Sequence, residues 1–381
     1  MKGLVISVNT AMSASLPPVL PAKDTRSTLR MVLEDGGPGF CVLSITPICN
    51  ANCGFCGFAR DVYNREHGSH MQLDRAFEAI DVMYRHGVRY LVLSGGEPLL
   101  HPDLLQIVER ARLLDMNVMI VTNGGLLSEK RIADLASVGL SGLVVSVDAA
   151  DAATHEKNRG LPGVCAKIKE TNQQLAHLGI SSTASVTMSR LVDYEQLPDF
   201  LKSLGFKWMT FSYPCRQMNG TSNLAQSDGD LMNFSDDELI IEFEKIKKLK
   251  KKLRVLNPTR SVEEMQRFLR NEPQRYPCLG GFRYFYVDWN SDLWRCQFWH
   301  EPICKVSEFE ASKTVRDNCT LCMIDCYRDS SLLHHIGVSL HDSWTELKQG
   351  RPIGAYKKLA TRANRDSLFS VLEDVAWIMK V

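Results

Sequence analysis

"FCVLSITPICNANCGFC", residues 40–56, joins a short β-rich run to three closely spaced cysteines. Cys49, Cys53 and Cys56 are separated by three and two residues, and Phe55 stands directly before the last of them. Three thiolates can hold three irons of a [4Fe–4S] cluster and leave the fourth iron open to a small molecule. Zinc is the alternative for clustered cysteines, but zinc prefers four ligands, and the nearest candidates for the fourth are His67 and His70. The spacing therefore favours an iron–sulfur cluster with one open iron.

Beyond this stretch, β-rich runs alternate with amphipathic patterns as far as residue 212. Predicted strands end near residues 46, 94, 122, 147, 187 and 212, and predicted helices span 72–86, 103–114, 128–138, 164–178 and 195–204. Strands that alternate with helices pair in parallel and are buried on both faces. The sequence therefore predicts an α/β fold of six βα units, arranged as an open twisted sheet or as a full or partial barrel.

The loops that follow the predicted strands carry polar and glycine-rich motifs. The cysteines follow the first strand, SGGEP (94–98) the second, NGG (123–125) the third and DAAD (148–151) the fourth. Because the carboxyl ends of parallel strands meet on one side of such a fold, chemistry gathers there. We expect the active face of the molecule on that side.

Composition restricts the class of protein. The chain has 381 residues, a formal net charge of +1 and 23% charged residues, which gives no global field for nucleic acid or an anionic membrane. No stretch reaches the roughly 18 apolar residues needed to span a membrane, and the N-terminus is a poor signal peptide. We therefore expect a cytoplasmic protein with reduced thiols, whose twelve cysteines are better interpreted as metal ligands than as disulfides.

Other segments have ordinary structural interpretations. Cys41, Cys165 and Cys215 are scattered through apolar surroundings, where a buried small hydrophobe is expected. The basic run KIKKLKKKLR (245–254) would place Ile246, Leu249 and Leu253 on one face of a solvated amphipathic helix.

Six further cysteines lie late in the chain, around a predicted β-hairpin with its turn at WNSD (289–292). They are Cys278, Cys296, Cys304, Cys319, Cys322 and Cys326. This region predicts a small metal-supported unit, with a structural zinc ribbon as the alternative to an iron–sulfur cluster. Helices are expected over 343–381.

The motif CNANCGFC resembles the CxxxCx-aromatic-C signature of the radical S-adenosylmethionine (SAM) superfamily, and SGGEP follows the next strand as that family's SAM-binding motif does. The resemblance covers about residues 40–215 and implies a partial (β/α)6 TIM-like barrel. It implies that Cys49, Cys53 and Cys56 ligate the SAM-cleaving [4Fe–4S] cluster and that Phe55 lies near the adenine. Ser94, Gly95, Gly96 and Glu97 would surround the SAM amino group, with Glu97 as its counter-charge.

Later strand ends would supply further contacts to SAM by the same resemblance. The candidates are Thr122, Asn123, Ser146, Asp148, Arg159, Ser185 and Thr187. Strand-end Ser, Thr and Asn often only cap the following helix, which is the alternative for those positions.

The late cysteines resemble the auxiliary-cluster domain of many radical SAM enzymes, in its twitch or a reduced SPASM form. That resemblance implies one auxiliary [4Fe–4S] cluster on Cys278, Cys296, Cys319 and Cys322, with Cys326 as the alternate ligand. The run CxxCx3C with no cysteine after 326 departs from the full SPASM pattern, which puts a second auxiliary cluster in doubt. We expect Cys304 to remain without a cluster.

The expected domain order follows from these assignments. It is an N-terminal extension (1–40), the radical SAM core (41–215), a linker with the basic helix (216–277), the auxiliary-cluster domain (278–330) and C-terminal helices (331–381).

The resemblance implies reductive cleavage of SAM to a 5′-deoxyadenosyl radical that abstracts hydrogen from a substrate. An external one-electron donor such as flavodoxin or ferredoxin would supply the electron. Only about forty residues precede the first strand, with no pattern of a leader-binding domain, which favours a small molecule such as a sugar, a cyclitol or another natural-product intermediate. A peptide-modifying SPASM maturase is the alternative, and a non-catalytic iron–sulfur or zinc scaffold is the alternative of another class. Cys304, Tyr213, Tyr286 and Asp288 are candidates for moving hydrogen late in the reaction.

Overall fold

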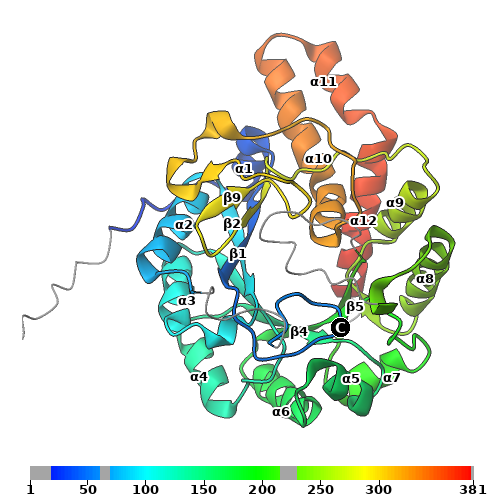
Figure 1. Cartoon of the computed structure of the whole chain (residues 1–381). Helices are drawn as coiled ribbons and strands as arrows, with labels where there is room; N and C mark the ends of the chain where they lie inside the picture. The colour runs from blue at the N-terminus through cyan, green and yellow to red at the C-terminus, as the bar shows by residue number, and fades with distance from the viewer. Residues whose placement is uncertain (1–18, 61–68, 215–229, 379–381) are drawn as a thin grey trace, which may run out of the picture.

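The computed structural model describes residues 19–60, 69–214 and 230–378. Within them, one ten-stranded sheet has the order β10-β9-β8-β1-β2-β3-β4-β5-β6-β7. Neighbouring strands from β1 to β7 pair in parallel, which confirms the predicted α/β fold and its six βα units. Figure 1 shows this sheet curving into a partial barrel with α2 to α8 around its outside.

The six predicted strands are observed almost as expected. They are β1 (Gly39–Thr46), β2 (Val88–Gly95), β3 (Asn117–Thr122), β4 (Gly142–Val147), β5 (Ser181–Thr187) and β6 (Trp208–Ser212). The five predicted helices are α2 (Leu73–Arg85), α3 (Leu104–Leu113), α4 (Glu129–Ser137), α6 (Val164–His177) and α7 (Leu197–Ser203). The apolar runs form strands because side chains on both faces enter one continuous core between sheet and helices.

Among the described residues of the barrel region, three α-helices and one strand were not predicted. They are α1 (Thr28–Asp35), α5 (Ala152–Arg159), β7 (Arg254–Val255) and α9 (Thr259–Leu269). The α5 helix is short and polar but begins with a good cap, since the Asp151 carboxylate accepts a hydrogen bond from the N–H of Thr154 at 2.8 Å. A helix of this kind gives little hydrophobic periodicity from which to predict it.

The basic run is only partly helical. The α8 helix (Asp236–Leu249) begins with a capping box between Ser235 and Glu238 and ends at Leu249, not at residue 254. Ile246 and Leu249 are buried on its inner face as expected, whereas Leu253 is buried from the turn that follows the helix.

The C-terminal third continues the sheet instead of forming a separate one. Strand β8 (Tyr284–Val287) pairs in parallel with β1, while β9 (Asp292–Trp294) and β10 (Cys304–Lys305) extend the edge antiparallel. The β8–β9 hairpin confirms the turn predicted at 289–292. The sheet is followed by α10 (Asp325–Lys348), α11 (Pro352–Leu359) and α12 (Arg362–Ile378), so the expected domain boundary at residue 330 falls inside α10. No helix in the described part of the chain is both long and apolar enough to cross a membrane.

Candidate active site

The loop after β1 is held by the motif after β2. The N–H of Gly96 donates to the Thr46 carbonyl at 2.7 Å, and the N–H of Glu97 donates to the Ile48 carbonyl at 2.8 Å. A Cβ atom on Gly95 would lie 2.1 Å from the Thr46 carbonyl oxygen, and one on Gly96 would lie 2.3 Å from the Ile48 oxygen. The glycines are therefore required by the close approach of the segment that leads into Cys49, a contact that the sequence alone did not reveal.

The Glu97 carboxylate is held by the protein. It is buried and accepts hydrogen bonds from the N–H of Leu99 at 3.0 Å, the hydroxyl of Thr122 at 2.8 Å and the N–H of Asn123 at 2.8 Å. Both oxygens thus have protein donors, and the role of Glu97 as a counter-charge for SAM stays a prediction. Glu97 connects the end of β2 to the end of β3 through these hydrogen bonds, and the Thr122 hydroxyl is one of the donors.

Cys49 receives donors of hydrogen bonds suited to a thiolate. The N–H of Ala51 lies 3.4 Å from its sulfur, and Nδ2 of Asn123 lies 3.7 Å from it. The same Nδ2 donates to Oδ1 of Asn50 at 2.8 Å, which fixes the direction of the amide. The backbone N–H of Phe58 donates to Cys56 in the same manner as Ala51 does to Cys49.

One buried cation lies next to the cysteine loop. Arg159 donates from Nη2 to Oδ1 of Asp148 at 2.6 Å, and its carbonyl accepts from the N–H of Asn52 at 2.8 Å. Its positive charge acts on both Cys49 and Cys53, and its Nε is buried with no hydrogen-bond partner among the described residues. Arg159 and Asp148 therefore form a buried ion pair under the cysteine loop.

Burial shapes the chemistry of these thiols. It raises the pKa of Cys53 to about 12 and that of Cys56 to about 11. A coordinating metal reverses this, because a thiol bound to it is deprotonated outright. Three neighbouring cysteines, with Cys53 buried and Cys49 and Cys56 half-buried, a hydrogen-bonded Cys49 sulfur and a nearby guanidinium are a donor set that fits an anionic iron–sulfur cluster.

His70 does not join the cysteines. Its ring packs against the ring of His101, with their centroids 5.1 Å apart, while His67 lies outside the described residues. Across the residues that the structure describes, no group of three His, Cys, Asp or Glu side chains could hold a single metal ion.

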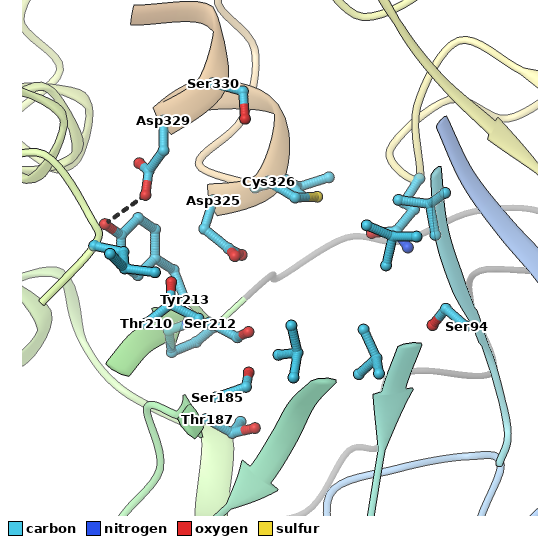
Figure 2. Close-up of a pocket in the computed structure, with 18 of the residues that line it drawn as sticks. Ser94, Ser185, Thr187, Thr210, Ser212, Tyr213, Asp325, Cys326, Asp329 and Ser330 are labelled. Atoms are coloured by element: carbon cyan, nitrogen blue, oxygen red, sulfur yellow. Dashed lines mark hydrogen bonds between the residues drawn. The ribbon is translucent and has the colours of Figure 1, made fainter. Parts of the chain in front are cut away.

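A cavity of about 770 Å³ opens beside the cysteine loop, within the range of small-molecule sites. Figure 2 shows Ser94, Ser185, Thr187, Thr210 and Ser212 on the strand side and Asp325, Cys326, Asp329 and Ser330 on α10 opposite them. The residues expected at the site that line this cavity are Phe55, Cys56, Ser94, Ser185, Thr187, Tyr213 and Cys326.

Other expected residues lie behind the cavity wall or apart from it. Ser146 is half-buried on β4, in register with Ser185. Tyr286 packs with Val42 and Trp294, and Asp288 is buried in the β8–β9 turn, where it accepts a hydrogen bond from Nε1 of Trp294 at 2.9 Å. These contacts assign Asp288 to the hairpin.

Residues that sequence reasoning missed also line the cavity. The polar ones are Thr210, Ser212, Asn233, Gln297, Asp325, Asp329 and Ser330, and the remainder are apolar side chains such as Val42, Phe234 and Leu333. The spacing of the two aspartates, four residues apart in DCYRD, was a signal that both lie on one helical face.

The late cysteines divide into two groups. Cys304 lies on β10 and packs against the barrel core, whereas the others gather in one cluster with Tyr284 and Tyr327: Cys278, Cys296, Cys319, Cys322 and Cys326. Cys278 accepts a hydrogen bond from the backbone N–H of Gly280 at 3.3 Å. Burial raises the pKa of Cys296, Cys319 and Cys322, and the backbone N–H groups of Phe298, Leu321 and Ile324, each two residues further on, act to lower it. The scattered Cys41 and Cys165 are buried as expected, and Cys215 lies outside the described residues.

Two arginines lie near these four cysteines. Arg295 forms a two-point ion pair with Asp317, at 2.7 and 2.9 Å, and its charge acts on Cys296 and Cys319. Arg328 acts on Cys322 and donates to the Tyr276 carbonyl at 2.8 Å. The gathered cysteines, the N–H of Gly280 on Cys278 and the two arginines fit a group of thiolates held around a second cluster.

Comparison with known proteins agrees with this geometry. Residues 43–204 match the profile of the family described as "Radical SAM superfamily". An AdoMet-dependent heme synthase of Methanosarcina barkeri is 34% identical over 133 residues, which cover 35% of this chain and 38% of that protein. A probable GTP 3′,8-cyclase of Methanococcus maripaludis is 30% identical over 166 residues, which cover 43% of this chain and 55% of that protein. The matches thus span less than two thirds of either relative.

Solved structures are similar in fold. Streptococcus suis SuiB bound to S-adenosylmethionine has a TM-score of 0.50 and 16% identity, covering 68% of this chain and 60% of that one. The structure of anSMEcpe with bound AdoMet has a TM-score of 0.52 and 15% identity, covering 74% and 82%. At these identities the likeness concerns the fold alone. Together with the cysteine loop and the family match, it shows that this chain carries a radical SAM domain, at residues 43–204.

Proposed function

We propose that this protein is a radical SAM enzyme that removes a hydrogen atom from a small molecule in the cavity between the strand ends and α10. Cys49, Cys53 and Cys56 would hold the cluster, and Phe55, Ser94, Ser185 and Thr187 would line the place of SAM. When bound, the cluster supplies the electron that cleaves SAM to methionine and a 5′-deoxyadenosyl radical. The observation that carries the proposal is the position of Cys56 and Phe55 on the wall of the 770 Å³ cavity.

The chain itself would orient and tune these cofactors. Gly95 and Gly96 fix the segment before Cys49, and Asn123 donates to the sulfur of Cys49. Hydrogen bonds to cluster sulfurs and nearby charge set the reduction potential of such clusters. Arg159 would offset negative charge beneath the loop, while burial of the loop restricts the access of water.

A second cluster is proposed on Cys278, Cys296, Cys319 and Cys322. Its support is that the four cysteines gather in one cluster, in which Cys278 accepts a hydrogen bond from the N–H of Gly280 at 3.3 Å. Cys326 is the alternate ligand, although it lines the main cavity, and Cys304 is expected to remain free of iron. The unit built from 278–330 would then bring this cluster to the substrate side, where it could accept an electron or bind the substrate.

Iron and sulfide counts test the two-cluster assignment. About eight irons per chain are expected for two cubes. Cys296→Ala combined with Cys322→Ala should leave about four, and Cys304→Ser should leave the count unchanged. About four irons in the unaltered chain would remove the second cluster from the proposal.

The small-molecule assignment rests on a cavity of about 770 Å³ whose wall combines short hydroxyl and carboxylate side chains with apolar ones. Modification of a peptide is the other candidate function. Both candidates require an external one-electron donor such as flavodoxin or ferredoxin. Anaerobic incubation with reductant and SAM should yield 5′-deoxyadenosine and methionine in equal amounts, and Cys56→Ala should abolish both. A non-catalytic iron–sulfur or zinc scaffold would form neither product in the unaltered chain.

A further inference from the structure

Two carboxylates face the cavity from the first turns of α10. Asp325 and Asp329 are four residues apart, so they lie one above the other on the same side of the helix. Both line the cavity, and Figure 2 shows them across from the strand ends that carry Ser185, Thr187 and Ser212. The two aspartates therefore line the same cavity as the residues proposed to surround SAM.

Asp329 is fixed by the barrel. Its Oδ2 accepts from Nδ2 of Asn257 at 2.7 Å and from the Tyr213 hydroxyl at 3.4 Å, and its Oδ1 accepts from the hydroxyl of Ser261. Asn257 is itself held by both backbone groups of Phe211, at 2.7 and 3.0 Å. This network joins α10 to β6 and fixes the position of the Asp329 carboxyl in the wall, where burial raises its pKa to about 6.

Asp325 also lines the cavity, and its carboxylate extends from α10 toward the strand ends. Like charges one helical turn apart repel each other. A cation in the cavity beside Asp325 would offset that repulsion and form a charge-assisted hydrogen bond, which is strengthened where water is excluded.

The rest of the wall is mixed. Thr210, Ser212 and Ser330 present hydroxyl groups, each of which both donates and accepts, among apolar side chains such as Val42 and Phe234. Hydroxyl side chains can pair with the hydroxyl groups of a sugar or cyclitol ring without selecting for charge. Selection for the charge of the bound molecule would come from the carboxylates of Asp325 and Asp329 on α10.

We propose that Asp325, supported by the fixed Asp329, binds a protonated amine of the substrate, which makes the substrate a hydroxylated amine. This inference rests on the proposed function, since it takes the cavity as the place where substrate meets SAM. A phosphorylated substrate would place negative charge against both aspartates, so the inference distinguishes this cavity from one that binds a nucleoside triphosphate.

The test measures binding by the reconstituted full chain, with SAM present and no reductant, so that no turnover occurs. The probes are two matched sets: glucosamine, glucose and glucose 6-phosphate, and 2-deoxystreptamine, scyllo-inositol and an inositol monophosphate. Apparent Kd values come from the rise of Tm with probe concentration. We expect at least one amine to bind about tenfold more tightly than its neutral counterpart, a difference of about 1.4 kcal/mol, with the phosphate weakest.

Variants on α10 identify the group responsible. Asp325→Asn should reduce the preference for the amine to about twofold or less, because it keeps the shape but removes the charge. Asp342→Asn is the matched control on the same helix, where Asp342 pairs with Arg316 at the surface at 2.8 Å, and it should keep the preference. SAM affinity is measured in parallel. A loss of SAM affinity as large as the loss of amine affinity would show that Asp325 serves SAM and would overturn the inference.

Two further results would also overturn it: no amine in either set binding more tightly than its neutral counterpart, or Asp325→Asn keeping the preference. A separate assay with reductant measures whether the unaltered chain forms 5′-deoxyadenosine. It distinguishes failure of the amine inference from failure of the proposed function. If that product forms without an amine preference, only the inference fails. If no product forms, the proposed function fails.

Discussion

Gly96→Ala tests how the cysteine loop is held. The new Cβ would lie 2.3 Å from the Ile48 carbonyl oxygen and 2.8 Å from that of Pro47. Ordinary contact begins at 3.4 Å, so the Ile48 backbone must move by at least 1.1 Å. No flexible side chain can yield here, and overpacking of this kind costs about 1–3 kcal/mol of unfolding free energy. The displaced segment leads directly into Cys49.

The functional effect should exceed the effect on stability. A misplacement of about 1 Å in a catalytic constellation costs on the order of 10²-fold in rate. We therefore expect 5′-deoxyadenosine formation to fall by about that factor, with loss of iron from the first cluster. Iron analysis, electron paramagnetic resonance and denaturant titration under anaerobic conditions measure the three effects.

Gly163→Ala is the control for this experiment. Its added Cβ meets nothing within 4 Å, so only the strain of its left-handed backbone, at φ of 76°, is added. That strain costs about 1 kcal/mol and should leave iron content and rate near those of the unaltered chain. The account of the glycine motif is refuted if Gly96→Ala keeps full iron content and a rate within about threefold of the unaltered chain.

Three other changes have defined outcomes. Asn123→Leu removes the donor to the Cys49 sulfur and should make the reduction potential of the first cluster more negative in a redox titration; an unchanged potential would contradict this. Arg159→Met leaves the fully buried Asp148 without its ion pair and should lower the free energy of unfolding by about 3–5 kcal/mol, whereas a loss under 1 kcal/mol would count against a buried pair. Burial lowers the pKa of His155 to about 4, below its ordinary 6.5. Between these two pH values the unfolded chain therefore binds a proton at His155 that the folded chain does not bind. Stability should therefore fall by up to about 3 kcal/mol as the pH drops from 6.5 to 4, and His155→Asn should flatten that slope in denaturant titrations.

The sequence predicted the barrel well because its signals are local. Each of the six strands is an apolar run bounded by glycine or polar residues, and each lies beside the next strand in chain order. The pairing of β8 with β1 was not predictable in this way, because it joins segments more than two hundred residues apart. The residues of Tyr284–Val287 do not indicate which strand they will pair with.

The candidate site shows the same division. The cysteine spacing predicted the cluster loop, yet the motif SGGEP could not show that the Glu97 carboxylate accepts hydrogen bonds from the N–H groups of Leu99 and Asn123. Asp325 and Asp329 were missed because their role depends on α10 crossing the chamber opposite the strand ends. Chemistry carried by one loop is visible in sequence, whereas a wall assembled from distant elements is visible only in the fold.

The central claim is that Cys49, Cys53 and Cys56 hold a cluster whose fourth iron is open to SAM. Electron paramagnetic resonance of the reduced, fully reconstituted protein, recorded with and without SAM, tests it most directly. The account predicts that SAM changes the signal of the cluster that is lost in Cys56→Ala and leaves the signal of the second cluster unchanged. A protein with its full complement of iron whose spectrum is identical with and without SAM would contradict the claim.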